Sequence, residues 1–281
     1  MNTSTTAPAT STLLADFLDG VQLPTMPDVA RELIATLHDD DIPFEKVRNA
    51  IARDPALTAK LIRLANSARF GLKRQLSSLD DGITMVGLNQ ERTLAMAACM
   101  SSSFAAVPGV DSQAFWKESM ATAGYAQWLA RTLGTNVQQS WLTGFMVRLG
   151  ELIIAQKVPE RIAEIERLPH FAGGRWEREH SVLGFTEGAV TAELARRWNF
   201  PEAIAHALET ASDPMRCEPF CRLGGILHIA TLLAELELDE HKSAADAIDA
   251  LPRDVVAALQ LDPEWLTAHM PDVESFIDTP I

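Results

Sequence analysis

The chain has 281 residues, of which 24 are basic and 38 are acidic, so its formal net charge is −14 at pH 7. A protein this acidic repels phosphate backbones, and we therefore expect no direct binding to nucleic acid. Hydrophobic residues make up 47% of the sequence, which excludes disorder over the whole chain.

Residues 1–20 begin with a sequence rich in Ser, Thr, Ala and Pro. We expect this segment to be mobile up to Thr10 and to form a short helix at 13–18. From residue 23 onward, apolar residues recur at intervals of three and four, the spacing of one helix face. This spacing occurs in the following segments: 44–51, 57–68, 142–153, 190–198, 204–208 and 223–230.

Proline positions support a helical interpretation. Asp54-Pro55, Asp262-Pro263 and Pro201 each fit a helix start, where the missing proline N–H is not needed. No segment alternates β-branched and polar residues, and no hairpin turn joins two strand-like runs. The sequence thus predicts an all-α protein of about a dozen helices, with Leu61 and Leu149 in its core.

The late part of the chain contains a short candidate linker at 239–243. Because it is short, we expect residues 216–281 to form a helical extension packed on the same body as residues 21–215. The longest uncharged run, 93–110, contains three serines, a proline and a glycine. We interpret it as a buried helix followed by a loop, and we expect no membrane span.

Cysteine content favours a reducing compartment, because three cysteines are too few and odd in number for a disulfide framework. The first fifteen residues contain no Lys or Arg and no apolar segment of the kind that a secretory signal needs. The expected location is therefore the cytoplasm.

Two cysteines raise the question of a zinc site. Cys217 and Cys221 lie near His206 and His228, but the two histidines are on either side of them and form no ligand pair. We interpret the cysteines as two small buried apolar residues. The sequence also contains no phosphate-binding glycine loop, no nucleophile elbow and no HExxH motif.

Several short segments form a more specific pattern. The most specific are Arg53 to Leu57 (RDPAL) and Arg63 to Ala68 (RLANSA). The weaker ones are Leu23 to Pro27, Ser78-Leu79 with Ile83 to Leu88, Phe115 to Ser119, Thr143 to Ile154 and Arg196 to Pro201. Over residues 21–215 this pattern resembles the HDOD family.

The resemblance implies a multi-helix fold related to the HD metal-dependent phosphohydrolases, usually without their catalysis, here with additional helices at both ends. It also implies a bacterial protein that acts as an adaptor, often near two-component and cyclic-dinucleotide signalling. Asn66 and Ser67 belong to the family's signature segment. They end a helix, where hydrogen bonds from such side chains to the backbone are favourable, so a structural role suffices for them.

Alignment by these motifs indicates what has become of the HD metal site. It places the metal-ligand positions on Glu118, Val147, Arg148 and Glu187, the lysine after the His-Asp pair on Glu151, and the late histidine pair near Ala211 and Ser212. Val147 offers no side-chain lone pair, and Arg148 puts a permanent positive charge where a divalent cation would lie. We expect no bound metal, no cofactor and no phosphohydrolase activity, because two carboxylates without imidazole do not rebuild the site.

The same alignment implies that the helices carrying positions 118, 148 and 187 converge. Two inward carboxylates would repel each other without a cation. We hypothesise that the Arg148 guanidinium takes the place of the metal ion, with Glu187 or Glu118 as its partner. Glu151, one turn after Val147, is an alternative acceptor, unless it faces solvent.

The sequence thus predicts a non-enzymatic signalling protein that binds another, unidentified, signalling protein. Two alternatives stay open. One is a sensor that binds a small molecule or cyclic dinucleotide in the remnant HD cleft, and the other is an enzyme with an unrecognised site. The oligomeric state is not indicated by any pattern, and surface specificity depends on geometry that the sequence does not show.

Overall fold

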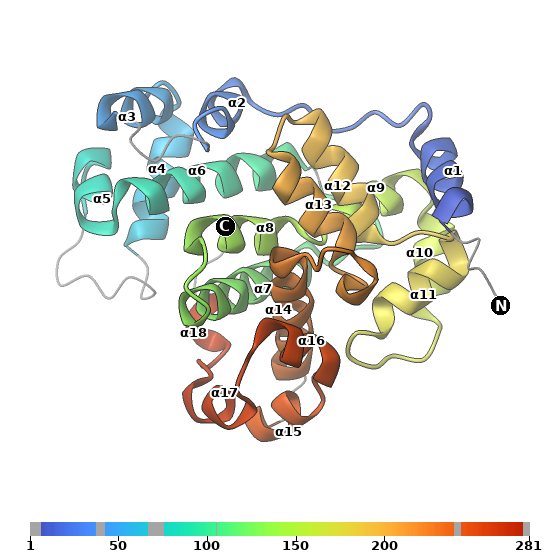
Figure 1. Ribbon diagram of the computed structural model, residues 1–281. Coiled ribbons are helices and arrows are strands. Elements are labelled where there is room, and N and C mark those ends of the chain that lie inside the picture. The colour runs from blue at the N-terminus through green and yellow to red at the C-terminus, as the bar shows by residue number, and fades with distance from the viewer. Residues whose placement is uncertain (1–6, 38–42, 67–75, 105, 239–242, 278–281) are drawn as a thin grey trace.

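The computed structural model describes residues 7–37, 43–66, 76–104, 106–238 and 243–277, and within these ranges the chain forms helices and no strand (Figure 1). The prediction of an all-α protein is therefore confirmed. The described ranges contain more helices than the expected dozen, because several near the C-terminus are only four to seven residues long.

Six helices form the first part of the chain: α1 (Ala7–Leu18), α2 (Asp28–Ile34), α3 (Phe44–Ala52), α4 (Pro55–Ala65), α5 (Leu79–Val86) and α6 (Leu88–Ser103). Helices α2 to α5 gather around α6 at one end of the molecule (Figure 1). Helix α4 begins at Pro55 as predicted, because the Asp54 carboxylate accepts hydrogen bonds from the Ala56 and Leu57 amides, each at 3.0 Å. Helix α1 begins at Ala7 rather than at residue 13.

Seven helices form the middle of the chain: α7 (Ser112–Thr132), α8 (Val137–Met146), α9 (Leu149–Lys157), α10 (Pro159–Glu166), α11 (Gly174–Leu183), α12 (Glu187–Arg197) and α13 (Glu202–Thr210). Helix α13 follows Pro201 as predicted. Helix α8 packs on α7, and α9 packs on α12, so these two pairs surround the junction between α8 and α9.

After a 3-10 turn, η2 (Pro214–Arg216), the last helices are α14 (Arg222–Leu238), α15 (Ala244–Asp249), α16 (Arg253–Leu259), α17 (Pro263–His269) and α18 (Glu274–Ile277). Helix α14 packs on α7, while α15 and α16 pack on α14. Helix α18 also rests on α7, where the Phe276 ring lies 5.0 Å from the Tyr125 ring.

One cluster of buried apolar side chains connects these groups of helices. Leu61 and Leu149 are completely buried, as predicted. The uncharged run that begins at residue 93 is a buried part of α6 that ends in a loop, which confirms its interpretation. In the described ranges, no helix combines the length and the hydropathy that crossing a membrane requires.

Helices α9 and α12 cross at Gly150. The Gly150 amide donates a hydrogen bond to Thr191 Oγ1 at 2.7 Å, and an added Cβ would clash with the Glu187 carbonyl oxygen. Because that oxygen belongs to backbone, we expect Gly150→Ala to lower the free energy of unfolding by about 1–3 kcal/mol in urea denaturation.

Gly82→Ala is the matched control, since the nearest atom to its added Cβ lies at 3.4 Å. There, loss of glycine from a helix interior should be neutral or stabilising by up to about 1 kcal/mol. Equal effects of the two substitutions would contradict the tight crossing at Gly150.

Glu91 on α6 is a second feature with a measurable consequence. Its side chain is 1% exposed, and neither carboxylate oxygen has a hydrogen-bond partner among the described residues. Burial raises the pKa of Glu91 to about 7. A raised pKa in the folded state stabilises the protein below the unfolded-state pKa, and this stabilisation is lost as the pH rises through about 7.

We therefore expect the wild type to lose about 1 kcal/mol of unfolding free energy relative to Glu91→Gln between pH 6 and pH 8. Because glutamine cannot ionise, the Glu91→Gln variant is the reference for the pH dependence of the wild type. Denaturation curves at several pH values measure the difference, and parallel pH dependences of the two proteins would show that Glu91 is not a buried acid.

Candidate functional site

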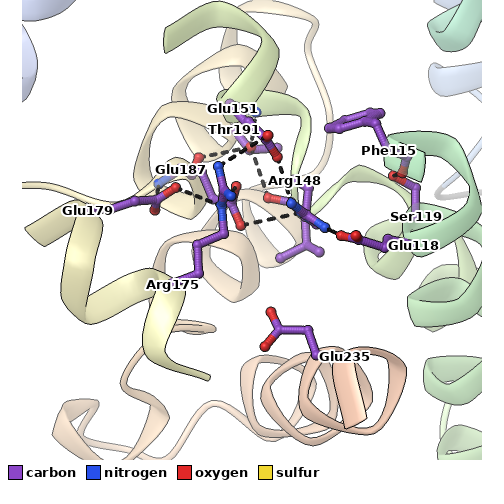
Figure 2. Close-up of polar contacts among 12 residues, drawn as sticks. Phe115, Glu118, Ser119, Arg148, Glu151, Arg175, Glu179, Glu187, Thr191 and Glu235 are labelled. Atoms are coloured by element: carbon purple, nitrogen blue, oxygen red, sulfur yellow. Dashed lines mark hydrogen bonds and ion pairs between the residues drawn. The ribbon is translucent and has the colours of Figure 1, made fainter. Parts of the chain in front are cut away.

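Arg148 lies at the junction between α8 and α9 and is buried. Its guanidinium contacts the carboxylate of Glu118 on α7 (Figure 2). It also contacts Glu151, one turn into α9, with Nη2 at 2.7 Å from Oε2, and Glu187, at the start of α12, with Nε at 3.9 Å from Oε1. Three helices thus bring the three predicted carboxylates to one guanidinium, at the place where the resemblance expects it.

Glu151, the alternative acceptor, does bond Arg148, and it is buried rather than facing solvent. Its side chain is 8% exposed and lies between two arginines. The second is Arg175 on α11, whose Nη2 lies 3.2 Å from Glu151 Oε1. Two guanidinium partners offset the desolvation cost of burying this carboxylate better than one arginine alone would.

Arg175 was not singled out in the sequence, yet it contacts more carboxylates than Arg148 does. Besides Glu151, it reaches Glu166 at 2.8 Å, Glu179 at 3.1 Å and Glu187 at 3.2 Å. The available signal was the spacing of Arg175 and Glu179, four residues apart on one helix. Because that spacing is common on solvated helix faces, it does not distinguish a buried ion pair from an exposed one.

We call the seven residues that share these contacts the Arg–Glu cluster: Arg148, Arg175, Glu118, Glu151, Glu166, Glu179 and Glu187. It contains five carboxyl groups against two guanidinium groups. Glu118 and Glu166 are partly exposed at its edge, while the other members are buried. The members come from α7, α9, α10, α11 and α12, with Arg148 just before α9.

The protonation states of the cluster differ from one carboxyl to the next. Burial raises the pKa of Glu187 well above its usual value, and the neighbouring Glu179 raises it further. Burial also raises the pKa of Glu179. Burial opposes ionisation of Glu151 too, but Arg148 and Arg175 outweigh it and lower its pKa. The two guanidinium groups therefore favour the ionised form of Glu151, whereas burial favours protonation of Glu179 and Glu187.

Backbone contacts fix the geometry of the cluster. The Glu187 amide, at the start of α12, donates to Glu179 Oε2 at 2.8 Å, which places a carboxyl group at the positive end of that helix. Thr191 Oγ1 lies 3.1 Å from the Val147 carbonyl oxygen, and the Val147 side chain itself is buried. Val147 therefore contributes its backbone carbonyl to a hydrogen bond and offers no side-chain ligand.

Ala211 and Ser212 lie apart from the Arg–Glu cluster. The Ala211 carbonyl accepts a hydrogen bond from His228 Nδ1 at 2.7 Å, and Ser212 lines a different groove. Asn66 bonds the backbone of Leu76 twice, through Nδ2 to the carbonyl at 2.9 Å and through Oδ1 from the amide at 2.6 Å. Asn66 thus has a structural contact, while Ser67 lies outside the described residues.

The cysteines are not the buried apolar residues that we expected, because both lie half-buried around the turn after η2. Cys217 Sγ lies 3.2 Å from His206 Nε2, whereas His228 stacks on Trp176 at 5.0 Å. Within the described ranges, no group of three or more His, Cys, Asp or Glu side chains is placed to hold a metal ion.

A cavity of about 580 Å³ opens beside the Arg–Glu cluster. Phe115, Glu118 and Arg148 line one side of it, and Glu235 of α14 lines another. The Glu235 carboxylate accepts a hydrogen bond from the Gly173 amide at 2.7 Å and lies across from the two arginines (Figure 2). The cluster is therefore reachable from solvent at this side.

Known proteins share this arrangement of helices. A Shewanella amazonensis SB2B protein named "putative phosphohydrolase" is 25% identical and has a TM-score of 0.78 over 95% of this chain and 97% of that one. An HDOD domain protein with unknown function from Geobacter sulfurreducens is 20% identical, with a TM-score of 0.77 over 93% of each chain. The fold is therefore the predicted HD-like fold, with an ion-pair cluster inside it.

The sequence comparison is more specific. Residues 23–214 match the HDOD domain, and this chain belongs to the HDOD family. A "putative signal transduction protein" from Marinobacter aquaeolei VT8 has a TM-score of 0.73 at 20% identity, over 93% of this chain and 62% of that one. An uncharacterized protein of Treponema pallidum (strain Nichols) is 26% identical over 213 residues, or 74% of this chain, which spans 40% of that protein's length.

Proposed function

We propose that this chain is a non-catalytic bacterial signalling protein that works by binding a partner protein. The observation that carries the proposal is the Arg–Glu cluster. At the point where the motif alignment places the HD metal ligands, Arg148 contacts Glu118, Glu151 and Glu187. A helical body whose centre is filled by ion pairs can present a surface, and it lacks the ligands with which an HD hydrolase activates water through a metal ion.

The residues of the cluster do not fit a divalent metal. An HD hydrolase holds its ion with imidazole and carboxylate groups. The cluster contains no histidine, and its buried carboxyl groups already bond guanidinium groups. A divalent cation would have to displace Arg148 or lie against its permanent positive charge. We therefore derive no metal-dependent step for this chain.

The family and the charge support a signalling role with a protein partner. The Marinobacter relative carries a signal-transduction name, which is the role that we propose for this chain. The net charge of −14 disfavours a nucleic-acid partner and favours a partner with a basic surface.

A small-molecule sensor is the second candidate, because the cavity of about 580 Å³ beside the cluster has the size of a small-molecule site. Both arginines of the cluster are engaged by carboxylates, so a phosphate group would have to break existing ion pairs to reach them. Calorimetric titration with cyclic dinucleotides tests this candidate, and we expect no heat of binding at micromolar concentrations.

The first experiment tests for catalysis. The purified chain is assayed with a phosphodiester, bis(p-nitrophenyl) phosphate, in the presence of Mn²⁺, Fe²⁺ or Mg²⁺. We expect no hydrolysis above the buffer rate and no stoichiometric zinc, iron or manganese by elemental analysis. Metal-dependent hydrolysis by the wild type, at a rate that the Arg148→Ala substitution changes, would overturn the proposal in favour of an enzyme.

The second experiment tests for a partner. The folded chain is used to capture proteins from its native cell, and the retained protein is then purified and titrated against the chain. We expect a defined complex whose affinity weakens with salt, as a basic partner surface requires. Cyclic-dinucleotide binding without any reconstituted protein complex would favour the sensor instead.

A further inference from the structure

A thiol and an imidazole meet in the groove between α1 and α13, away from the Arg–Glu cluster. Cys217 Sγ lies 3.2 Å from His206 Nε2. His206 is on α13, and Cys217 directly follows η2, so the turn after α13 folds the chain back to bring the two together. A nucleophilic atom within hydrogen-bond reach of a base is the arrangement that activates cysteine in many proteins.

The groove gives a reagent access to this pair. It has a volume of about 1070 Å³, enough for a molecule of several hundred daltons, and both Cys217 and His206 line it. Leu14 and Leu18 of α1 form an apolar wall, and the polar lining combines Arg197 and Arg216 with the carboxylates of Asp19, Glu193, Glu209 and Asp213. Cys217 is half-buried and His206 is exposed, so the sulfur is held in place but not covered.

We propose that Cys217 is a reactive thiol that forms a mixed disulfide with low-molecular-weight disulfides, and that His206 is its base. The Cys217 sulfur attacks one sulfur of the reagent, RS–SR, while the thiol proton passes to His206 Nε2. A new S–S bond forms, the S–S bond of the reagent breaks, and the leaving RS⁻ takes the proton to give RSH. The electrons balance because the Cys217 sulfur is oxidised from the thiol to the disulfide level while the leaving sulfur of the reagent is reduced from the disulfide to the thiol level.

The other two cysteines are internal controls. Cys99 is buried in α6, and burial raises its pKa to about 11, which makes it unreactive while the protein is folded. Cys221 is half-buried only four residues beyond Cys217 and directly precedes α14, where its sulfur accepts a hydrogen bond from the Gly224 amide at 3.4 Å, so it compares an amide contact with an imidazole contact. Exposure alone therefore does not distinguish Cys221 from Cys217, whereas the imidazole contact does.

The test is the rate of glutathionylation of the folded full chain by glutathione disulfide, followed by mass spectrometry of the peptides. At pH 7 we expect Cys217 to react first and His206→Ala to slow its modification about fivefold, because an unassisted thiol is only a few per cent ionised there. We also expect a different pH profile of the rate in the variant, because hydroxide rather than His206 must then remove the thiol proton. His180→Ala, which changes another histidine of the same groove, should leave the rate unchanged.

Two results would overturn the proposal. One is reaction of Cys221 at the same rate as Cys217, which would show that the imidazole contact gives Cys217 no advantage. The other is an unchanged rate and pH profile for Cys217 in His206→Ala. Far-ultraviolet circular dichroism of each variant establishes that the chain is folded, and a conservative His206→Gln variant, which keeps polarity but provides no base, should behave like His206→Ala.

Discussion

Arg148→Ala is expected to lower the free energy of unfolding by about 3–5 kcal/mol, because it leaves buried carboxyl groups without their cation. Glu151 and Glu187 would lose a guanidinium partner, and only Arg175 would remain to offset their charge. The loss should shrink as the pH is lowered, since protonation removes the uncompensated charge. Urea denaturation at pH 7 and at pH 5 measures both effects.

Arg161→Ala is the matched control for this substitution. Arg161 pairs with Glu164 at 2.8 Å, and both side chains are about half exposed, so its loss should cost under about 1 kcal/mol. Arg148→Lys keeps the charge but not the planar fork that serves several carboxylates, so an intermediate loss is expected. A similar cost for Arg148→Ala and Arg161→Ala would show that the cluster is solvated and would remove the basis for a closed centre.

Leu149→Ala is expected to lower the free energy of unfolding by about 2–5 kcal/mol. Leu149 is fully buried at the start of α9, next to Arg148, and its removal leaves a cavity among packed helices. The same range applies to Leu61→Ala in α4, a fully buried position at the far end of the molecule. Urea denaturation of the full chain measures both variants.

The exposed leucine at position 13 provides the control. Leu13 in α1 is 48% exposed, so Leu13→Ala should change the free energy of unfolding by about 0.5 kcal/mol or less. A Leu149→Ala curve that coincides with the Leu13→Ala curve would place the 142–153 apolar stripe on the surface. Because the Leu149 and Arg148 effects have different causes, only the Arg148 effect should depend on pH.

Local signals in the sequence were sufficient to predict the helices that begin with a capped proline. Asp54 and Asp262 each accept hydrogen bonds from the first free amides of their helices, an interaction that depends only on neighbouring residues. The apolar stripes containing Leu61 and Leu149 were equally clear, because a helical face repeats every three to four residues whatever it packs against. Extra helices such as α15 and α18 were harder to predict, since four to six residues carry little periodicity.

The candidate site could be predicted in part. Motif alignment indicated that positions 118, 148 and 187 converge, and the structure brings Glu118, Arg148 and Glu187 together. The residues that complete the cluster lie on other helices and carry no motif. Glu151 was predicted only as an alternative acceptor, and the Cys217–His206 contact joins residues that the sequence did not pair.

The amino-acid sequence by itself determined the helical class, the caps, the apolar faces and the loss of histidine from the HD positions, because each depends on residue type and on short spacings. Only the tertiary structure decided which charged faces are buried. Arg175 and Glu179 have the spacing of a solvated ion pair, and they become part of the cluster only because the fold brings Glu151 of α9 and Glu187 of α12 to them. Burial depends on the neighbours that folding supplies, so the second guanidinium could not be found along a single helix.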